Sequence, residues 1–182
     1  MTKVFVGGSR RIVRLNSEVV LRLDRMLAKR VSILVGDANG ADKSVQTFLK
    51  TREYRDVEVF CSGDDCRNNV GNWKLRRVAV ESRKREFDFY AAKDQLMSRE
   101  AGSGLMIWDN KSAGTLMNAL RLVRQGKQVS IFEAQHARFR ELHSESAWND
   151  FFSGCSDEVK SRIAKLSASD SEIAAPVQAS LL

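Results

Sequence analysis

Cysteine, histidine and proline are scarce in this chain of 182 residues, which contains three cysteines, two histidines and a single proline. Three cysteines cannot all pair with one another, and Cys61 and Cys66 lack the second cysteine pair that would complete a zinc site. We therefore expect reduced thiols without a joint role, and no bound metal. Both histidines, His136 and His143, lie late in the chain, so a histidine general base is not expected.

Long apolar runs are also missing. None approaches the length of about 18 residues that a membrane-spanning helix needs, and the first ten residues lack the basic, apolar and small-residue order of a secretory signal. We expect a cytoplasmic protein. The hydrophobic fraction of 43% is sufficient for the core of one ordinary domain with an appendage. The 30 basic residues exceed the 23 acidic ones, and a net charge of +7 attracts the phosphates of a nucleotide or of a nucleic acid.

Short apolar runs alternate with helical patterns along most of the chain. Strands are predicted where apolar runs end in turn formers, over residues 3–6, 31–35, 57–61, 105–108 and 128–132. Helices are predicted between them, one capped by Asn16 or Ser17 and others over 41–51, 80–100 and 112–125. A long loop over 62–73 has no clear periodicity. This order predicts an α/β fold with a five-stranded parallel, Rossmann-like sheet and helices on both faces.

The sequence pattern changes after residue 133. We expect residues 1–133 to form the domain with the Rossmann-like sheet and residues 134–166 a helical appendage, with helices over 134–142, 146–152 and 157–166. Residues 167–182 are rich in Ser and Ala and are predicted to be poorly ordered. Trp148, Phe151 and Phe152 are too apolar for a free segment, so the appendage is expected to pack on the core or on a partner subunit.

Three loops rich in small residues follow predicted strands, at residues 7–10, 36–42 and 109–115. In a parallel sheet such loops converge on the crevice outside the carboxyl ends of the strands, where ligands bind. In the last loop, a helix that opens at Ser112, Gly114 and Thr115 presents unpaired backbone N–H groups and a positive dipole end, which suit a phosphate. Asp109 ends the strand before it. A plain turn with a capped helix is the alternative explanation.

Glycines in the first two loops would let the backbone approach a ligand, and the charged residues beside them would bind it. Arg10 is placed to neutralise a phosphate, and Asp37 or Asp42 to bind ribose hydroxyls or to cap the following helix. In the 62–73 loop, Trp73 either stacks on a base beside Arg67, Asn68 and Asn69 or holds the loop to the core. The predicted ligand-binding residues are Gly7, Gly8, Ser9, Arg10, Gly36, Asp37, Gly40, Ala41, Asp42, Lys93, Asp94, Asp109, Ser112, Gly114 and Thr115.

The three loops resemble those of the SLOG superfamily of Rossmann-like proteins, which includes the LOG phosphoribohydrolases, the DNA-processing protein DprA and sensors of nucleotide ligands. The matching segments are Phe5-Val6-Gly7-Gly8-Ser9-Arg10, the stretch 35–42 with its Gly-Ala-Asp element, and the stretch 109–115. The resemblance covers residues 3–132. It implies binding of a nucleotide or a nucleotide-derived small molecule, and self-association as a homodimer or higher oligomer.

The resemblance fails at one important point. LOG enzymes carry acidic residues directly after the Gly-Thr pair, and the related nucleoside deoxyribosyltransferases place a Glu three positions beyond their Thr. Here the corresponding residues are Leu116, Met117 and Asn118, and an asparagine is neither a nucleophile toward an oxocarbenium-like centre nor a base at pH 7. We therefore expect ligand binding, in a sensor or a ligand-processing domain, rather than the family's usual catalysis.

Two alternative functions remain open. An N-glycosidase or deoxyribosyltransferase would need a carboxylate from elsewhere, for which the candidates are Asp37, Asp42, Glu81, Glu86 and Asp94. The position of Lys93 and Asp94 corresponds to an Arg-Lys pair of the LOG enzymes, so Lys93 is expected to contact a phosphate and Asp94 to orient it or a ribose hydroxyl; a surface salt bridge is the alternative. Nucleic-acid binding in the manner of DprA would use Arg76, Arg77, Arg83, Lys84 and Arg85. No cofactor is expected.

Overall fold

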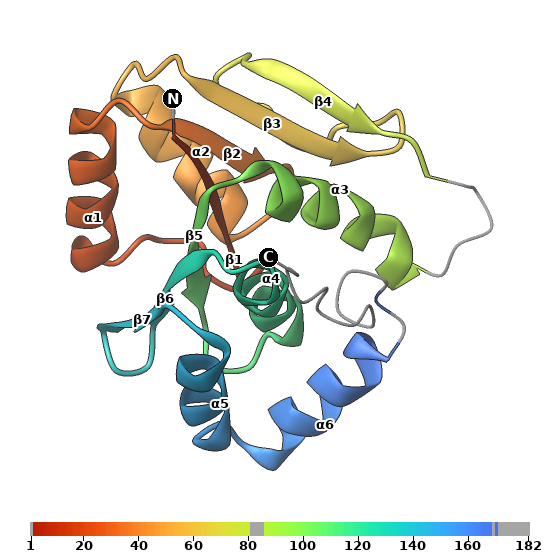
Figure 1. Cartoon of the computed structure of the whole chain (residues 1–182). Helices are drawn as coiled ribbons and strands as arrows, with labels where there is room; N and C mark the ends of the chain where they lie inside the picture. The colour runs from red at the N-terminus through yellow and green to blue at the C-terminus, as the bar shows by residue number, and fades with distance from the viewer. Residues whose placement is uncertain (1, 81–85, 169, 171–182) are drawn as a thin grey trace, which may run out of the picture.

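A sheet of seven strands forms the centre of the computed structural model, which describes residues 2–80, 86–168 and 170 (Figure 1). The order across the sheet is β4-β3-β2-β1-β5-β6-β7. The strands are β1 (Lys3–Gly8), β2 (Ser32–Gly36), β3 (Val57–Ser62), β4 (Lys74–Val78), β5 (Ser103–Trp108), β6 (Gln128–Glu133) and β7 (Arg138–Leu142). The helices are α1 (Ser17–Ala28), α2 (Ala41–Thr51), α3 (Glu86–Glu100), α4 (Ala113–Arg124), α5 (Glu145–Ser153) and α6 (Asp157–Ser167).

The sheet is larger than the five parallel strands that we expected. The strands β4 and β7 extend it at its two edges, and β7 pairs with β6 in the antiparallel direction. The predicted helix over 134–142 is wrong, because Arg138–Leu142 forms β7 and Phe139 packs its ring 5.1 Å from that of Phe132. The predicted helix over 80–100 is described only as α3, from Glu86 onward, and residues 81–85 lie outside the described part of the chain.

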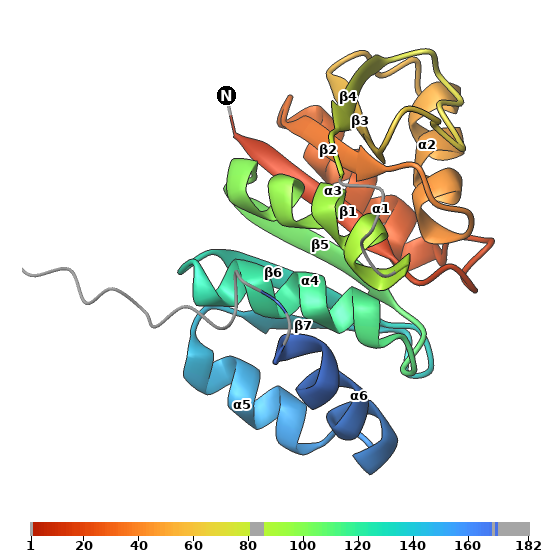
Figure 2. The same ribbon diagram turned by 90° about the vertical axis from the view of Figure 1, so that its right-hand side faces the viewer.

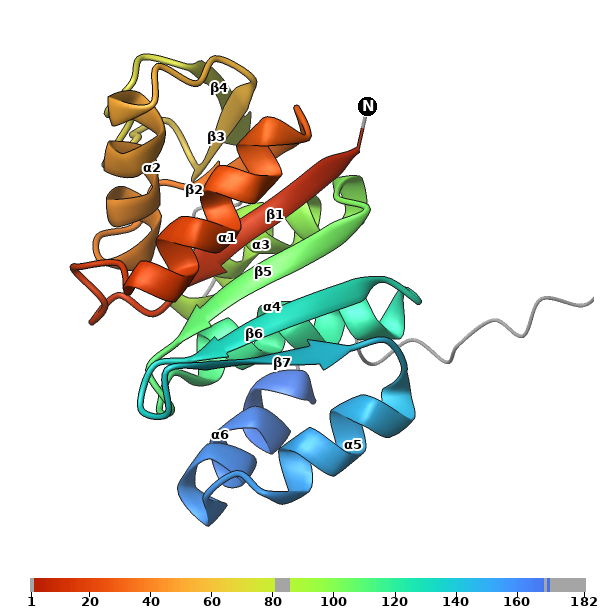
Figure 3. The ribbon, with the colours of Figure 1, turned by 90° about the vertical axis from the view of Figure 1, so that its left-hand side faces the viewer.

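Two layers of helices cover the sheet. The helices α1 and α2 lie on one face, and α3 and α4 lie on the other (Figure 3). Residues that alternate along the strands contribute to the two cores in turn: Val4 and Val6 face α1 and α2, whereas Phe5 faces α3 and α4. All five residues of β2 are buried, as expected for a central strand covered on both sides.

The helices α5 and α6 form a further layer against α4 and β7 (Figure 2). Trp148 is 5% exposed, its ring stacks on that of Phe152 at 5.3 Å, and Phe151 contacts Trp108 of β5 at 5.7 Å. These aromatic residues therefore pack on the core of the same chain. Of the segment 167–182, predicted to be poorly ordered, all but residues 167, 168 and 170 lies outside the described residues. Within the described part, no helix is long and apolar enough to span a membrane.

The strand order reverses between β1 and β5. From β1 the chain first adds β2, β3 and β4 on one side, and then β5, β6 and β7 on the other. The parallel register pairs Gly8 with Ile107 and Gly36 with Phe60, so the loops after β1, β2 and β5 emerge at one edge of the sheet. Such a reversal opens a crevice at the carboxyl ends of the strands.

Candidate functional site

A pocket of about 490 Å³ lies at this reversal, between the loops after β1 and β2 and the helices α3, α4 and α6. Its volume is within the range of small-molecule sites in proteins. The helices α3 and α6 lie on opposite sides of α4 (Figure 2). Nine of the residues that we predicted line the pocket: Gly7, Gly8, Arg10, Asp42, Lys93, Asp94, Ser112, Gly114 and Thr115.

The other predicted residues do not line the pocket, and among them Ser9 holds the loops together. Ser9 accepts hydrogen bonds at its carbonyl from the amides of Ile12, at 3.1 Å, and of Ala41, at 3.0 Å, and its own amide donates to the Ile107 carbonyl at 2.9 Å. These bonds join the loops after β1 and β2 to the end of β5. Six of the predicted residues do not line the pocket: Ser9, Gly36, Asp37, Gly40, Ala41 and Asp109.

Asp109 closes the turn that leads into α4. Its carboxylate accepts hydrogen bonds from the amides of Lys111, at 3.1 Å, and Ser112, at 2.7 Å. Burial would raise the pKa of Asp109, but the Ser9 hydroxyl, these two amides and the charge of Arg11 outweigh burial and hold the pKa below its usual value. Asp109 thus acts on the pocket indirectly, by fixing the start of the helix.

The glycines of the loops fall into two groups. A Cβ atom at Gly8 would overlap the Ile107 carbonyl, one at Gly36 would overlap Asp42 and Lys93, and Gly40 has a φ of +83°, so the packing of the chain itself requires these three glycines. A Cβ atom at Gly114 would meet nothing within 4 Å. Gly114 also lines the pocket, so the first turn of α4 has room beside it.

Lys93 is a buried cation of the pocket. Its side chain is 5% exposed, its Nζ donates to Asp94 at 2.7 Å, and it lies 4.0 Å from carboxylate oxygens of both Asp37 and Asp42. Burial would lower the pKa of Lys93, but the three carboxylates outweigh it and raise the pKa above its ordinary value. The alternative of a salt bridge between Lys93 and Asp94 is therefore correct as to the pair, but Lys93 is buried and not at the surface.

Asp42 is buried in the same surroundings, but there burial outweighs the neighbouring charges in its effect on the pKa. Desolvation raises its pKa to about 6, although Lys93 and the Ala38 amide act to lower it. Asp37 differs, because the effect of burial is outweighed by hydrogen bonds from Arg67, and its pKa is lowered. The Arg67 amide, Nε and Nη2 donate to Asp37 at 3.1, 3.0 and 2.7 Å.

A chain of polar contacts extends from Lys93 across α4. Asp94 accepts a hydrogen bond from the Asn118 amide group at 3.1 Å, and Asn118 in turn accepts one from Arg121. Arg121 is 1% exposed and donates from Nε to Asp170 at 2.9 Å. Asn118 thus holds the carboxylate of Asp94, which comes from another helix.

Sequence reasoning missed Asn118 and Arg121 as pocket residues. Both line the pocket, and they are three positions apart on α4, whose ten buried residues are otherwise apolar except for Thr115. A polar pair at helical spacing on a buried face is the signal that would have found them.

The loop over 62–73 contributes Arg67 to the pocket, whereas Trp73 does not line it. The indole of Trp73 donates to the Tyr54 carbonyl at 2.8 Å, and its backbone exchanges two hydrogen bonds with the side chain of Asn69. Trp73 therefore fixes the loop to the core. On the opposite side of the loop, Gln46 donates to the Asn68 carbonyl at 3.2 Å.

A disulfide joins Cys61, at the end of β3, to Cys66, with a Cα–Cα distance of 5.3 Å. The expectation of reduced thiols without a joint role is wrong for this pair, because the turn at residues 62–65 returns the chain to β3. Cys155 is free. Within the described part of the chain, Asp37 and these two sulfurs form the one cluster with ligand atoms close enough for a metal ion, and the disulfide occupies both sulfurs.

Exposed cations surround the mouth of the pocket. Arg10, Arg162 and Lys165 line it, and Arg162 lies 3.9 Å from Glu158. The structure gives Arg10 and Lys165 no acidic partner among the residues it describes. The mouth is therefore positively charged.

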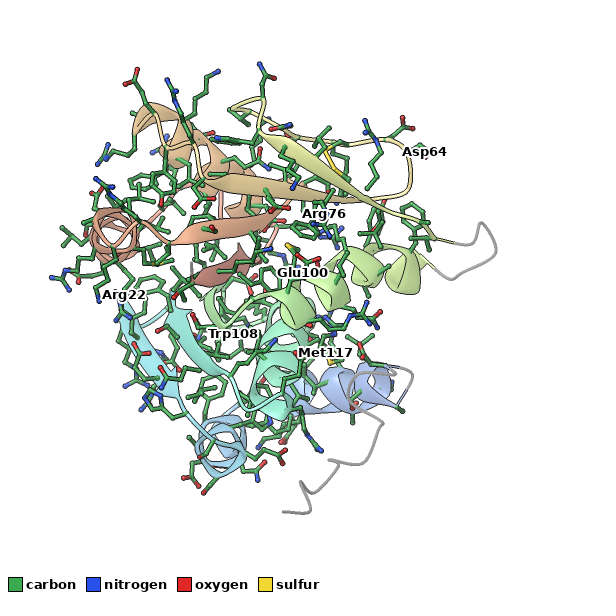
Figure 4. The ribbon with its side chains drawn as sticks, turned by 45° about the horizontal axis from the view of Figure 1, so that its top comes forward. Arg22, Asp64, Arg76, Glu100, Trp108 and Met117 are labelled. Carbon is green, nitrogen blue, oxygen red and sulfur yellow. A yellow bond between two sulfur atoms is a disulfide. The ribbon has the colours of Figure 1, made fainter. Side chains whose placement is uncertain are left out.

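The basic residues predicted for nucleic-acid binding either do not line the pocket or lie outside the described part of the chain. Arg76 pairs with Glu100 at 2.6 Å and with Glu58 at 3.2 Å (Figure 4), and Arg77 donates to the Asp64 carbonyl at 3.2 Å. Residues 83–85 are outside the described part of the chain. The catalytic candidate Glu81 is likewise outside it, and the side chain of Glu86 is not described.

No protein-family model matches the sequence, and no curated protein matches it. Among solved structures, the chain is similar to DNA processing protein A from Helicobacter pylori, whose single-stranded DNA binding mode has been described. The TM-score is 0.51 and the identity 16%, over 91% of this chain and 80% of that one. At this identity the similarity shows the fold alone, which is an α/β fold of the Rossmann-like class.

Proposed function

We propose that this protein binds a nucleotide or a nucleotide-derived small molecule in the pocket between α3, α4 and α6. The observation that carries the proposal is the pocket itself, which combines a nucleotide-compatible volume, a position at the reversal of strand order and open space at the first turn of α4. The exposed cations that line the pocket, Arg10 and Lys165, favour a phosphorylated ligand.

Isothermal titration against AMP, ADP, NAD, ADP-ribose and cyclic dinucleotides tests the proposal. Arg10 lines the pocket and the exposed Arg14 does not, which makes them a matched pair. We expect Arg10→Gln to weaken binding about tenfold, because it removes a charged hydrogen-bond donor, and Arg14→Gln to leave affinity unchanged. No heat from folded protein with any of these ligands would refute the proposal. Light scattering on the same samples tests the proposed homodimer or higher oligomer.

A second candidate is binding of single-stranded nucleic acid, and it is favoured by the fold of the structural neighbour and by the exposed cations Arg10, Arg162 and Lys165. Fluorescence polarisation with a labelled oligonucleotide should then show affinity that falls steeply with salt. Absence of binding at low salt would exclude it.

A third candidate is cleavage of an N-glycosidic bond, favoured by the two carboxylates that line the pocket, Asp42 and Asp94. Chromatography of AMP and NAD after incubation would detect free base. The Asp94→Asn variant should then abolish release, because Asp94 would be the catalytic carboxylate.

A further inference from the structure

Arg67 lines the pocket with its guanidinium already held on two sides. Asp37 binds Nε and Nη2 along one edge of the guanidinium, and the ring of Tyr90 lies 4.5 Å from the guanidinium carbon. The Asp37 side chain is 2% exposed and that of Arg67 is 31% exposed. The accessible part of Arg67 is therefore the part that is bound neither to Asp37 nor to Tyr90.

These contacts make Arg67 a poor phosphate ligand. Its charge is matched by the buried carboxylate of Asp37, and two of its N–H directions are already used. Arg10, by contrast, is exposed at the mouth of the pocket. A phosphate is thus favoured near Arg10 and not near Arg67.

The same contacts suit Arg67 for stacking. A guanidinium is planar, is weakly hydrated and stacks on aromatic systems. Its position is fixed before any ligand arrives, because the Arg67 amide also binds Asp37 and the next residue, Asn68, donates to the Asp37 carbonyl at 2.8 Å. Little side-chain entropy remains to be lost when a flat group binds.

We propose that Arg67, stacked on Tyr90, forms the subsite for the base of the bound nucleotide. The inference rests on the proposed function and deepens it, because it requires a ligand that contains a nucleobase rather than a sugar phosphate alone. The base lies against Arg67, and the phosphate lies toward Arg10.

A comparison of AMP with ribose 5-phosphate tests the subsite, because the two ligands differ by the base. We expect the wild-type protein to bind AMP at least about tenfold more tightly than ribose 5-phosphate, because stacking of one base contributes about this much affinity. Arg67→Lys keeps the positive charge but removes the planar guanidinium. It should therefore weaken the binding of AMP about tenfold and leave the affinity for ribose 5-phosphate within about twofold of wild type. Tyr90→Leu should have the same selective effect, and Tyr90→Phe, which keeps the ring, should have none.

The outcomes separate the subsite from the pocket. Equal wild-type affinities for AMP and ribose 5-phosphate, or an equal loss for both ligands in folded Arg67→Lys and Tyr90→Leu proteins, would overturn the stacking subsite and leave phosphate binding intact. If neither these two ligands nor any nucleotide of the titration panel binds folded wild-type protein, the proposed function fails and the subsite fails with it. Circular dichroism and thermal melting establish that each variant is folded.

Discussion

Replacing Gly114 with alanine separates the stability of α4 from the affinity of the pocket. A Cβ atom at this position meets no atom within 4 Å, so the methyl group fits without strain. Alanine in place of glycine within a helix gains about 0.5–1 kcal/mol, which corresponds to a rise in Tm of about 1–4 °C for a chain of this size. The same methyl group enters space where we place the ligand, and overpacking of about 1–3 kcal/mol weakens affinity by a factor of about 5 to about 100.

Thermal melting and titration with AMP measure the two effects on the same samples. Gly126→Ala is the matched control, because Gly126 follows the other end of α4 and also has open space but has a φ of +69°. This control should lower Tm and leave AMP affinity unchanged, since Gly126 does not line the pocket. A fall in Tm for Gly114→Ala would contradict the strain-free fit of the methyl group, and a rise in Tm with unchanged affinity would refute the placement of the ligand at the start of α4.

Three further substitutions test the buried charges and the disulfide. Asp170→Asn leaves the buried Arg121 without its carboxylate partner and should cost about 3–5 kcal/mol in urea unfolding. The pKa of Asp42 is about 6 in the folded state against 3.8 in the unfolded chain, so the folded state binds the proton of this group more tightly. Asp42 therefore lowers the free energy of unfolding as the pH rises from about 4 to 6, by on the order of 3 kcal/mol. Asp42→Asn should remove this decline. Cys66→Ser should lose about 2 kcal/mol and become insensitive to dithiothreitol, because the disulfide closes a short loop with a separation of five residues.

Each of these expectations has its own control or contrary result. Asp150→Asn on the exposed side of α5 should leave unfolding unchanged, and an equally small effect of Asp170→Asn would mean that Arg121 is not held by this pair. Parallel stability curves for wild-type and Asp42→Asn proteins between pH 4 and 6 would show that Asp42 does not titrate there. Wild-type stability that is equal with and without dithiothreitol would contradict the role of the disulfide.

The buried strands were predictable from the sequence, and the edge strands were not. The strands β1, β2, β3, β5 and β6 contain apolar runs because both of their faces are covered. In β4 the charged residues Arg76 and Arg77 dominate, and β7 alternates charged residues with Phe139 and Leu142. Edge strands pair on one side only and tolerate such charge, so their apolar signal is weak.

The candidate site was likewise predictable from the sequence only in part. The loops were predictable because small residues after strands constrain the backbone locally, and the parallel topology then brings their ends together. The polar chain across α4 was not, because Asn118 finds its partner 24 residues away and Arg121 finds its partner 49 residues away. A sequence shows neither that these distant residues meet nor that Lys93 is buried beside three carboxylates.

The pocket depends on both ends of the described chain, since Arg10 follows β1 whereas Lys165 lies on α6. Such a site forms only after the distant segments have folded onto one another. A ligand that binds only the folded chain stabilises it, by about 2.7 kcal/mol when its free concentration is 100 times its Kd. Resistance of the whole chain to proteolysis should therefore rise with ligand concentration, which would make the lifetime of this protein a measure of how much ligand surrounds it.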